Sequence, residues 1–271
     1  MPQLNMLVDG RKISENILKN TAIDVALLKK PPRLHVITCE PTFETKKFIE
    51  LKSKRAAEVG IEIVLTELDS EGSTQAAVMA VQQSVANSDG IVVQLPFPKR
   101  IDIEEVLTAI PPSHDADVLT YDGSQEEVLP PVVGAISAIL DTHNIELKGK
   151  KVAVLGQGML VGRPSVIWLK SKGAEVTSIT EHTKKVAEIT KQADVVVTGV
   201  GKTGILTPKM IKEGVVIIDA GTSEQKGQLA GDVDPACEKK ASLFTPVPGG
   251  VGPITVAILL RNVLRLAEQK R

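Results

Sequence analysis

The sequence predicts an α/β protein built from two α/β domains. Short, β-branched apolar runs alternate with longer amphipathic stretches, the pattern of parallel strands covered by helices on both faces. A polar, turn-rich segment at 121–127 divides this alternation into two series. The length of 271 residues, 42% of them hydrophobic, is sufficient for two domains of moderate size. We expect a first domain at 1–125, joined by the closing segment 254–271, and a second at 126–253, with the ligand cleft between them.

The first series contains three predicted strands and two predicted helices. The strands are LHVITC from Leu34, IEIVLTEL from Ile61 and IVVQLP from Ile91, and the helices cover 44–59 and 73–87. Gly60 ends the first helix, because glycine readily adopts the left-handed conformation found at helix C-termini. Gln94 stands where the third strand meets the loop above the sheet. Ligands of open α/β sheets bind at that edge.

The second series contains four predicted strands with helical spacers. They are KKVAVLGQG from Lys150, AEVTSIT from Ala174, ADVVVTGV from Ala193 and GVVIIDAG from Gly214. A proline- and glycine-rich stretch follows, and then the amphipathic segment 254–269, which we predict to be a helix that packs back on the first domain.

Composition excludes several classes of function. With 32 basic and 33 acidic residues the net charge is -1, which gives no general attraction to nucleic acid or to a membrane surface. Cys39 and Cys237 lie far apart and the four histidines are scattered, so we expect neither a disulfide nor a metal site. The N-terminal residues lack a secretory signal, and no apolar stretch approaches the roughly 20 residues of a membrane span. We expect a cytoplasmic protein.

The segment VAVLGQGMLVG is a candidate dinucleotide site. It places Gly156, Gln157, Gly158 and Gly162 directly after an apolar strand and at the start of a predicted helix. Such a turn lets backbone N–H groups approach a pyrophosphate, whose charge the helix dipole favours. The glycine pattern alone is unspecific, and the alternative is a turn needed only for tight strand–helix packing.

Glu181 follows the next predicted strand. An acidic side chain at this place accepts hydrogen bonds from the ribose hydroxyls of the adenosine half and repels a 2′-phosphate. The alternative is a solvated loop charge, since surface glutamates are common.

Five segments resemble the bifunctional methylenetetrahydrofolate dehydrogenase/methenyltetrahydrofolate cyclohydrolase family. They are TPVPGGVGPIT (245–255), VVQLPFP (92–98), GQGMLVGRP (156–164), IIDAG and GDVD. The resemblance covers nearly the whole chain. It implies oxidation of 5,10-methylenetetrahydrofolate by NAD or NADP, hydrolysis of the methenyl product to 10-formyltetrahydrofolate, and a homodimer. Taken alone, the proline-glycine loop is better explained as a rigid turn.

The resemblance also assigns roles to individual residues. Lys52 falls on the catalytic lysine of the family, Gln94 on the glutamine that holds it, and Asp117 on the carboxylate that binds the pterin ring. Pro248, Gly249 and Gly250 fall on the substrate loop. These residue types suit the chemistry, because pterin N–H groups are donors to a carboxylate and an amine can position or deprotonate water. Without the resemblance, Lys52 would be taken for a solvated helix lysine, Gln94 for the end of a strand and Asp117 for a turn cap.

A lysine acts as a base only when its pKa falls from about 10.4. Burial lowers it, and so does a second cation, for which Lys54 is the candidate.

Several positions depart from the family pattern. Phe48 replaces a tyrosine, Thr45 replaces a serine, and His114 and Val118 replace a lysine and a glycine. Phe48 keeps a ring for stacking on the substrate but lacks the phenolic hydroxyl. Two alternatives therefore stay open. One is a dehydrogenase of another reduced pterin, and the other is a catalytically silent protein that binds a dinucleotide.

The departures also bear on the cofactor. Gln157 and Gly158 replace the arginine-serine pair that is common in the family, which removes the groups that pair with a 2′-phosphate. Together with Glu181 they favour NAD over NADP.

Overall fold

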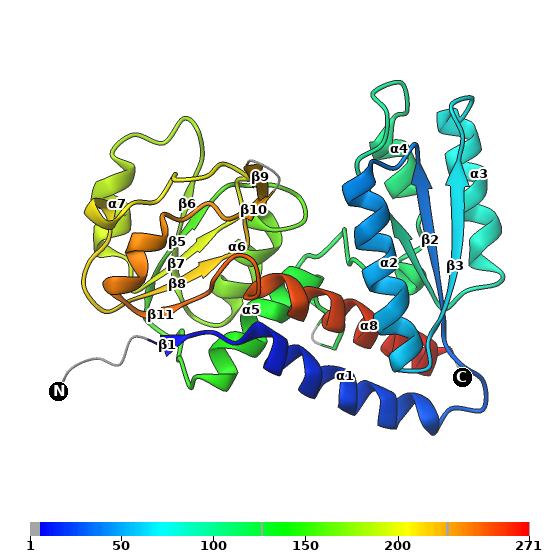
Figure 1. Cartoon of the computed structure of the whole chain (residues 1–271), viewed down its shortest axis with the longest axis horizontal. Helices are drawn as coiled ribbons and strands as arrows, with labels where there is room; N and C mark the ends of the chain where they lie inside the picture. The colour runs from blue at the N-terminus through cyan, green and yellow to red at the C-terminus, as the bar shows by residue number, and fades with distance from the viewer. Residues whose placement is uncertain (1–5, 126, 226–227, 271) are drawn as a thin grey trace. The chain divides into compact units, whose positions relative to one another are not determined.

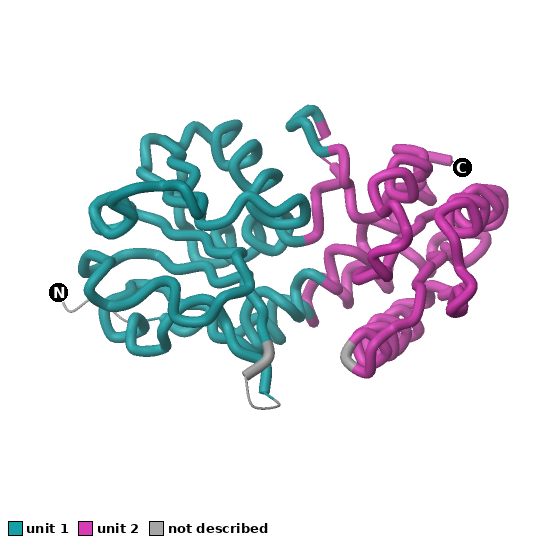
Figure 2. The backbone as a smooth tube through the Cα atoms, turned by 90° about the horizontal axis from the view of Figure 1, so that it is seen from above, with its two compact units in different colours: residues 1–14, 121–124, 132–255 teal, residues 15–120, 125–131, 256–271 magenta. Residues whose placement is uncertain are grey.

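A computed structural model describes residues 6–125, 127–225 and 228–270. The chain forms two compact units whose segments interleave along the sequence (Figure 2). Unit 1 contains residues 1–14, 121–124 and 132–255, and unit 2 contains residues 15–120, 125–131 and 256–271. That these units are separate domains with the boundaries expected above stays a prediction.

Unit 2 is built on a parallel sheet of three strands (Figure 1). The order is β3 (Glu62–Leu68), β2 (Arg33–Cys39), β4 (Gly90–Val93). Successive side chains of a strand point to opposite faces, so Leu34 and Val36 belong to one buried cluster and Ile37 and Cys39 to another. The sheet is therefore buried on both faces.

Helices cover the two faces of this sheet. One face packs against α1 (Gly10–Ala26), α2 (Phe43–Glu58) and α8 (Val251–Gln269), and the other packs against α3 (Thr74–Val85) and α4 (Ile103–Thr108). A short 3-10 helix, Pro112–His114, follows α4. Caps explain two helix starts: the Thr42 hydroxyl accepts from the N–H of Thr45 at the start of α2, and Ser73 does the same for α3.

The C-terminal helix α8 completes the core of unit 2. Val256, Leu260, Val263 and Leu264 lie in the same cluster as strands β2 and β4, as predicted for the segment 254–269. Residue 271 lies outside the described residues. The amide nitrogen of Asn262, which is fully buried, donates to the carbonyls of Ala116 (3.0 Å) and Leu129 (2.8 Å).

Unit 1 contains a six-stranded parallel sheet. Its order is β1 (Met6–Leu7), β11 (Ala241–Phe244), β8 (Val215–Asp219), β7 (Val195–Thr198), β5 (Lys151–Leu155), β6 (Glu175–Ile179). From β5 the chain moves outward to β6 and then crosses to the other side of β5 to form β7. This reversal makes the carboxyl ends of β5 and β7 the topological switch point, where doubly wound folds bind ligands. An antiparallel pair, β9 (Ser223–Gln225) and β10 (Gln228–Ala230), is separate from this sheet.

Three α-helices and two 3-10 helices accompany this sheet in the described part of the chain. They are α5 (Pro131–Thr142), α6 (Gly162–Ser171), α7 (Val186–Gln192) and the 3-10 helices Pro208–Met210 and Pro235–Lys239. Helix α6 contacts β5 and β6, while Val186 and Ile189 of α7 pack against the cluster that contains Ala153 and Leu155.

The predicted α/β class with parallel sheets is confirmed, and all seven predicted strands are present. The short strands β1, β9, β10 and β11 and the helices α1, α4 and α5 were not predicted from the sequence. None of the helices described is long and apolar enough to cross a membrane.

Candidate active site

Lys52 and Gln94 form a hydrogen-bonded pair in unit 2. Lys52 lies in the third turn of α2 and is only 7% exposed. Its Nζ donates to Oε1 of Gln94 at 2.7 Å. Strand β4 ends at Val93, so Gln94 is the first residue beyond the strand, and its Nε2 donates to the Leu95 carbonyl at 3.1 Å. The amide is thereby oriented with its oxygen toward the lysine.

Burial controls the charge of this lysine. It lowers the pKa of Lys52 below its usual value, and the carboxylate of Asp117 partly offsets the change. Burial likewise raises the pKa of Asp117, and the charge of Lys52 works against that rise. The second cation suggested by the sequence is not the cause, because Lys54 is exposed and makes no contribution to the shift. The structure thus places the predicted residue Lys52 in hydrogen-bond contact with the amide of Gln94 and close enough to Asp117 for their charges to interact.

Asp115 shapes the turn that carries Asp117. Its carboxylate accepts from the backbone N–H of Asp117 at 3.1 Å and from that of Leu119 at 2.6 Å. Burial raises the pKa of Asp115 to about 6, although these hydrogen bonds lower it. Val118, between the two donors, has a φ of +53°, in the left-handed region. Asp115 therefore holds in place a turn that a β-branched residue does not favour.

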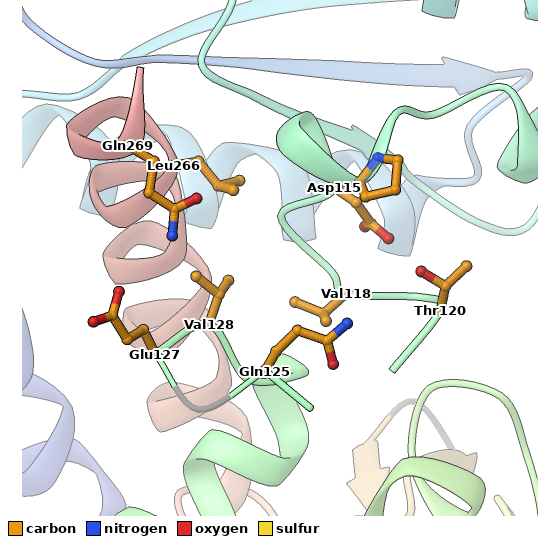
Figure 3. A pocket seen from close by; sticks show the side chains of 9 residues that line it. Asp115, Val118, Thr120, Gln125, Glu127, Val128, Leu266 and Gln269 are labelled. Atoms are coloured by element: carbon orange, nitrogen blue, oxygen red, sulfur yellow. The ribbon is translucent and has the colours of Figure 1, made fainter. Parts of the chain in front are cut away.

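Behind this turn lies a cavity of about 280 Å³ (Figure 3). Asp115 and Val118 line it on one side and Leu266 and Gln269 of α8 on the other, and Gln125 and Glu127 lie along its lower edge in this view. None of the predicted site residues lines it.

The three glycines of the candidate dinucleotide turn have different requirements. Gly156 has a φ of +93°, and a Cβ there would lie 2.7 Å from the carbonyl oxygen of Gly199; a Cβ at Gly162 would overlap the carbonyl of Gly156. Gly158 is different, because a Cβ there meets nothing within 4 Å. Packing within the protein explains Gly156 and Gly162 but not Gly158, whose missing side chain leaves open space.

Open space beside Gly158 and the start of helix α6 suit a pyrophosphate at this turn. Val161 is the N-cap of α6, and its side chain makes no capping hydrogen bond. The N–H of Arg163 donates to the Gly158 carbonyl at 3.1 Å and Pro164 has no N–H, so the first turn offers a ligand the N–H of Gly162. The side chain of Gln157 folds back on the turn itself, because its Nε2 donates to the Gly156 carbonyl at 2.6 Å.

Glu181 lies two residues beyond β6, the strand next to β5. Its side chain is 85% exposed, and its carboxylate is 3.5 Å from Nε2 of His182. Lys185, a cation that follows closely, is already paired with Glu188 at 3.2 Å.

The proline-glycine loop leads from β11 into α8. Gly249 has a φ of +106°, and its carbonyl accepts from the N–H of Gly10 at 3.1 Å. A Cβ at Gly250 would lie 2.6 Å from the carbonyl oxygen of Pro246. Pro248, at the tip, is exposed. Because the close approach and the positive φ both require glycine, the loop has a fixed shape.

Sequence reasoning missed two buried carboxylates, Asp219 and Asp232. They lie in the segments IIDAG and GDVD, which carried the family resemblance but were given no role. A charged residue at the end of an uninterrupted apolar run, as in VVIID, was the available signal.

Comparisons with known proteins identify the family of this chain. The model of the family described as "Tetrahydrofolate dehydrogenase/cyclohydrolase, catalytic domain" matches residues 8–117, and that of its NAD(P)-binding domain matches residues 130–271. The chain belongs to the tetrahydrofolate dehydrogenase/cyclohydrolase family. It is thus a bifunctional enzyme of folate one-carbon metabolism with an NAD(P)-binding domain of Rossmann type.

Relatives in this family match over their full length. A bifunctional protein FolD from Hydrogenobaculum sp. (strain Y04AAS1) is 34% identical over 97% of this chain and 99% of its own. The crystal structure of the bifunctional FolD enzyme from Campylobacter jejuni has a TM-score of 0.94 at 31% identity and covers 98% of this chain and 99% of its own. The FolD of Trypanosoma brucei, crystallised with NADP and an inhibitor, has a TM-score of 0.92 at 32% identity, with 98% of each chain covered. The predicted family and enzyme class are confirmed.

Three residues that depart from the family pattern lie near Lys52 and Asp117. Phe48 lies one turn before Lys52 on α2, is 43% exposed, and has its ring centroid 5.3 Å from the lysine Nζ. Thr45 is buried, and its hydroxyl lies 3.1 Å from that of Thr42. Val118 stands where the family has glycine, at the positive φ described above. The chain keeps the fold of the dehydrogenase/cyclohydrolase family, whereas side chains around Lys52 and Asp117 differ from the family pattern.

Proposed function

We propose that this enzyme oxidises 5,10-methylenetetrahydrofolate to the 5,10-methenyl compound and hydrolyses the latter to 10-formyltetrahydrofolate, with Lys52, Gln94 and Asp117 as catalytic residues. The buried hydrogen bond from Lys52 to Gln94 is the observation that carries the proposal. A buried amine with a lowered pKa can accept a proton at a pH where a solvated lysine cannot.

In the hydrolysis, water adds to the methenyl carbon and the bond from this carbon to one ring nitrogen then breaks. A neutral Lys52 accepts one proton of the attacking water and returns it to the departing nitrogen. The second proton leaves the hydroxyl to solvent as the formyl C=O forms, which balances the loss of the positive charge of the methenyl compound. The amide oxygen of Gln94 fixes the position of the Lys52 Nζ and stabilises it once protonated.

Asp117 serves binding and orientation. Its carboxylate accepts from the amino and ring N–H groups of the pterin, and its charge interacts with that of Lys52. We assign substrate contacts to the ring of Phe48 and to Pro248, Gly249 and Gly250 in the proline-glycine loop, whose shape is fixed without substrate.

NAD(P) supplies the hydride acceptor of the oxidation, and the residues present fit it. Gly158 leaves open space at the start of α6, and the first turn of that helix has no side-chain cap. Gly156 and Gly162 shape the turn, Gln157 gives no charge for a 2′-phosphate, and Glu181 accepts from the ribose hydroxyls. The protein's contribution to hydride transfer is alignment of the two reactants. NAD is therefore the favoured cofactor, and we further propose a cytoplasmic homodimer.

The test is a spectrophotometric assay of the purified protein with methylenetetrahydrofolate and each dinucleotide. We expect reduction of NAD in preference to NADP, followed by loss of the methenyl absorbance. Turnover only with a different reduced pterin would replace the substrate proposed here. Dinucleotide binding without any turnover would show that the side chains around Lys52 no longer support catalysis.

A further inference from the structure

Two buried aspartates of unit 1 have no cation partner among the residues that the structure describes. Asp219 ends β8 and Asp232 follows β10, and they are 2% and 0% exposed. Neither takes part in a salt bridge within the described part of the chain. A carboxylate removed from water is costly unless hydrogen bonds replace its hydration. Their hydrogen bonds therefore indicate what these carboxylates do.

Asp232 binds the loop that follows β7. One carboxylate oxygen accepts from the backbone N–H of Val200 at 2.6 Å, and the other accepts from that of Lys202 at 2.7 Å. The two residues lie on either side of Gly201, whose φ is +74°. Both oxygens of the carboxylate are thus used to fix the loop 199–202, which we call the β7 loop.

Asp219 connects the β7 loop to two other loops. Its Oδ1 accepts from the Thr198 hydroxyl at 2.8 Å and from the N–H of Asp232 at 3.2 Å, and its Oδ2 accepts from the N–H of Val233 at 2.9 Å. Its own N–H donates at 2.7 Å to the hydroxyl of Thr245, the first residue of the proline-glycine loop. One carboxylate and its backbone therefore fix the end of β7, the segment around Asp232 and the start of the substrate loop.

Two glycines make room for these carboxylates. A Cβ at Gly221 would overlap the carboxylate of Asp232, and a Cβ at Gly231 would overlap that of Asp219 and lie 2.8 Å from the Val247 side chain. The carboxylates thus occupy the space in which a side chain would otherwise pack.

The β7 loop lies against the dinucleotide turn. The N–H of Gly199 donates to the carbonyl of Leu155 at the end of β5 (3.0 Å), and Val161 fills the space that a Cβ of Gly199 would need. A Cβ at Gly156 would meet the Gly199 carbonyl at 2.7 Å. Val200 nevertheless stays 41% exposed. The loop is thus anchored by Asp232 on its inner side and open on its outer side, at the switch point where doubly wound folds bind ligands.

We propose that Asp232 is a positioning residue for dinucleotide binding, which holds the β7 loop against the glycine turn, and that Asp219 ties this loop to the substrate loop. The proposal rests on the proposed function of the glycine turn as the dinucleotide site. Two apolar side chains in place of the carboxylates would avoid the desolvation of two charges. Apolar side chains would not fix the direction of the N–H groups of Val200 and Lys202. A carboxylate does fix it, because its two acceptor oxygens belong to one rigid group.

The test compares Asp232→Asn with Asp234→Asn by measuring dinucleotide binding to the full chain without folate. Asparagine has nearly the volume of aspartate but must turn an N–H₂ group toward Val200 or Lys202, whose N–H groups are donors. Asp234 is the matched control, because its carboxylate also accepts a backbone N–H, from Ala236 at 2.9 Å, but is only half-buried and does not bind the β7 loop. We expect the dissociation constant for NAD to rise at least tenfold in Asp232→Asn and to change less than twofold in Asp234→Asn.

A second pair of variants leaves the buried carboxylates untouched. Gly201→Ala places a side chain at positive φ inside the anchored loop, where the nearest atom is 3.5 Å away. Gly204→Ala imposes the same strain at a φ of +71°, beyond the loop and with nothing within 4 Å. We expect Gly201→Ala alone to weaken dinucleotide binding, with the KM for folate within twofold of the wild-type value. If the β7 loop has only a structural role, Gly201→Ala and Gly204→Ala should both have lower melting temperatures than the wild type, and their dissociation constants for NAD should be equal.

The outcomes separate the two proposals. If the wild type binds neither NAD nor NADP, the function proposed for the glycine turn is wrong. If it binds one of them, and both Asp232→Asn and Gly201→Ala bind it as tightly, the positioning role of Asp232 is overturned while the proposed function stands.

Discussion

The Nζ of Lys52 lies 2.7 Å from Oε1 of Gln94 and 5.3 Å from the ring centroid of Phe48. An amide oxygen and an aromatic face both favour an ammonium, whereas burial favours the neutral amine. Burial is the larger effect and lowers the pKa of Lys52, as its proposed role as proton acceptor requires.

Replacing Lys52 with methionine should abolish hydrolysis of the methenyl compound and leave hydride transfer measurable. Water activation needs the amine, whereas the oxidation depends mainly on alignment. Both rates can be followed on one preparation. Lys54→Met is the control, because Lys54 is an exposed lysine of the same helix, and it should keep both activities. Hydrolysis at the wild-type rate in Lys52→Met would remove Lys52 from the mechanism.

Phe48→Tyr should raise the rate of hydrolysis by about 10²-fold, the lower end of the range for a well-placed acid or base. The added hydroxyl extends from a ring that already faces the Lys52 amine and can order the attacking water. Phe43→Tyr is the control. Phe43 lies on the same helix with Lys47 over its ring at 4.2 Å, but it is far more exposed. Equal rates in both variants would mean that another group already orders the water.

Gly158→Ala should keep the melting temperature of the wild type and weaken dinucleotide binding more than tenfold. The protein leaves the space beside Gly158 open, so only a ligand can conflict with the new methyl group. Gly162→Ala should instead lower the free energy of unfolding by about 1–3 kcal/mol, because its Cβ overlaps the carbonyl of Gly156. Calorimetry and titration with NAD measure the two effects. Unchanged binding by Gly158→Ala would place the pyrophosphate elsewhere.

Glu181→Gln should reduce the preference for NAD over NADP by about tenfold, or about 1.4 kcal/mol. The carboxylate accepts from a 2′-hydroxyl and repels a 2′-phosphate, and glutamine removes the repulsion. Values of kcat/KM for both cofactors give the ratio. Glu188→Gln removes a nearby exposed carboxylate, which pairs with Lys185, and should leave the ratio unchanged. A wild type that favours NADP would contradict the role given to Glu181.

Asp115 should make the protein less stable as the pH rises from about 4 to about 6. Its pKa of about 6 in the fold exceeds the value of 3.8 expected when unfolded, so in this window the folded chain binds more protons and the free energy of unfolding falls with rising pH. The loss from this one group is on the order of 3 kcal/mol and is complete above pH 6. Denaturant titrations of Asp115→Asn should show a shallower decline between these pH values, whereas Asp122→Asn, an exposed control, should follow the wild type. Identical slopes in Asp115→Asn and the wild type would contradict the raised pKa.

Local pattern was enough to predict the long elements of the fold. The strand at Leu34 and the helix ended by Gly60 have strong periodicity and a clear stop signal, and the structure confirms both. Strand β1, Met6–Leu7, has no such signal because two residues carry no period. It forms only by pairing with β11, more than 230 residues later in the chain, and such pairing depends on tertiary context.

The residues of the candidate site were likewise predicted only in part. The motif positions of Lys52, Gln94 and Asp117 were predicted from family resemblance, and the structure brings Lys52 and Gln94 into hydrogen-bond contact. Asp219 and Asp232 were not predicted. Their meeting depends on where three separate loops fold back, and the sequence of IIDAG or GDVD alone does not contain that information.

The interleaving of the two units sets an order for their completion during synthesis. Residues 15–120 contain all three strands of unit 2, yet one face of that sheet packs on Val256, Leu260 and Val263. A ribosome making about 5–20 residues per second releases these side chains only after the whole of unit 1 has been translated. Until then, helices α1 and α2 cover the apolar face of the nascent strands β2 and β4 only in part. A chain that stops before α8 should be recognised by chaperones and proteases as unfinished.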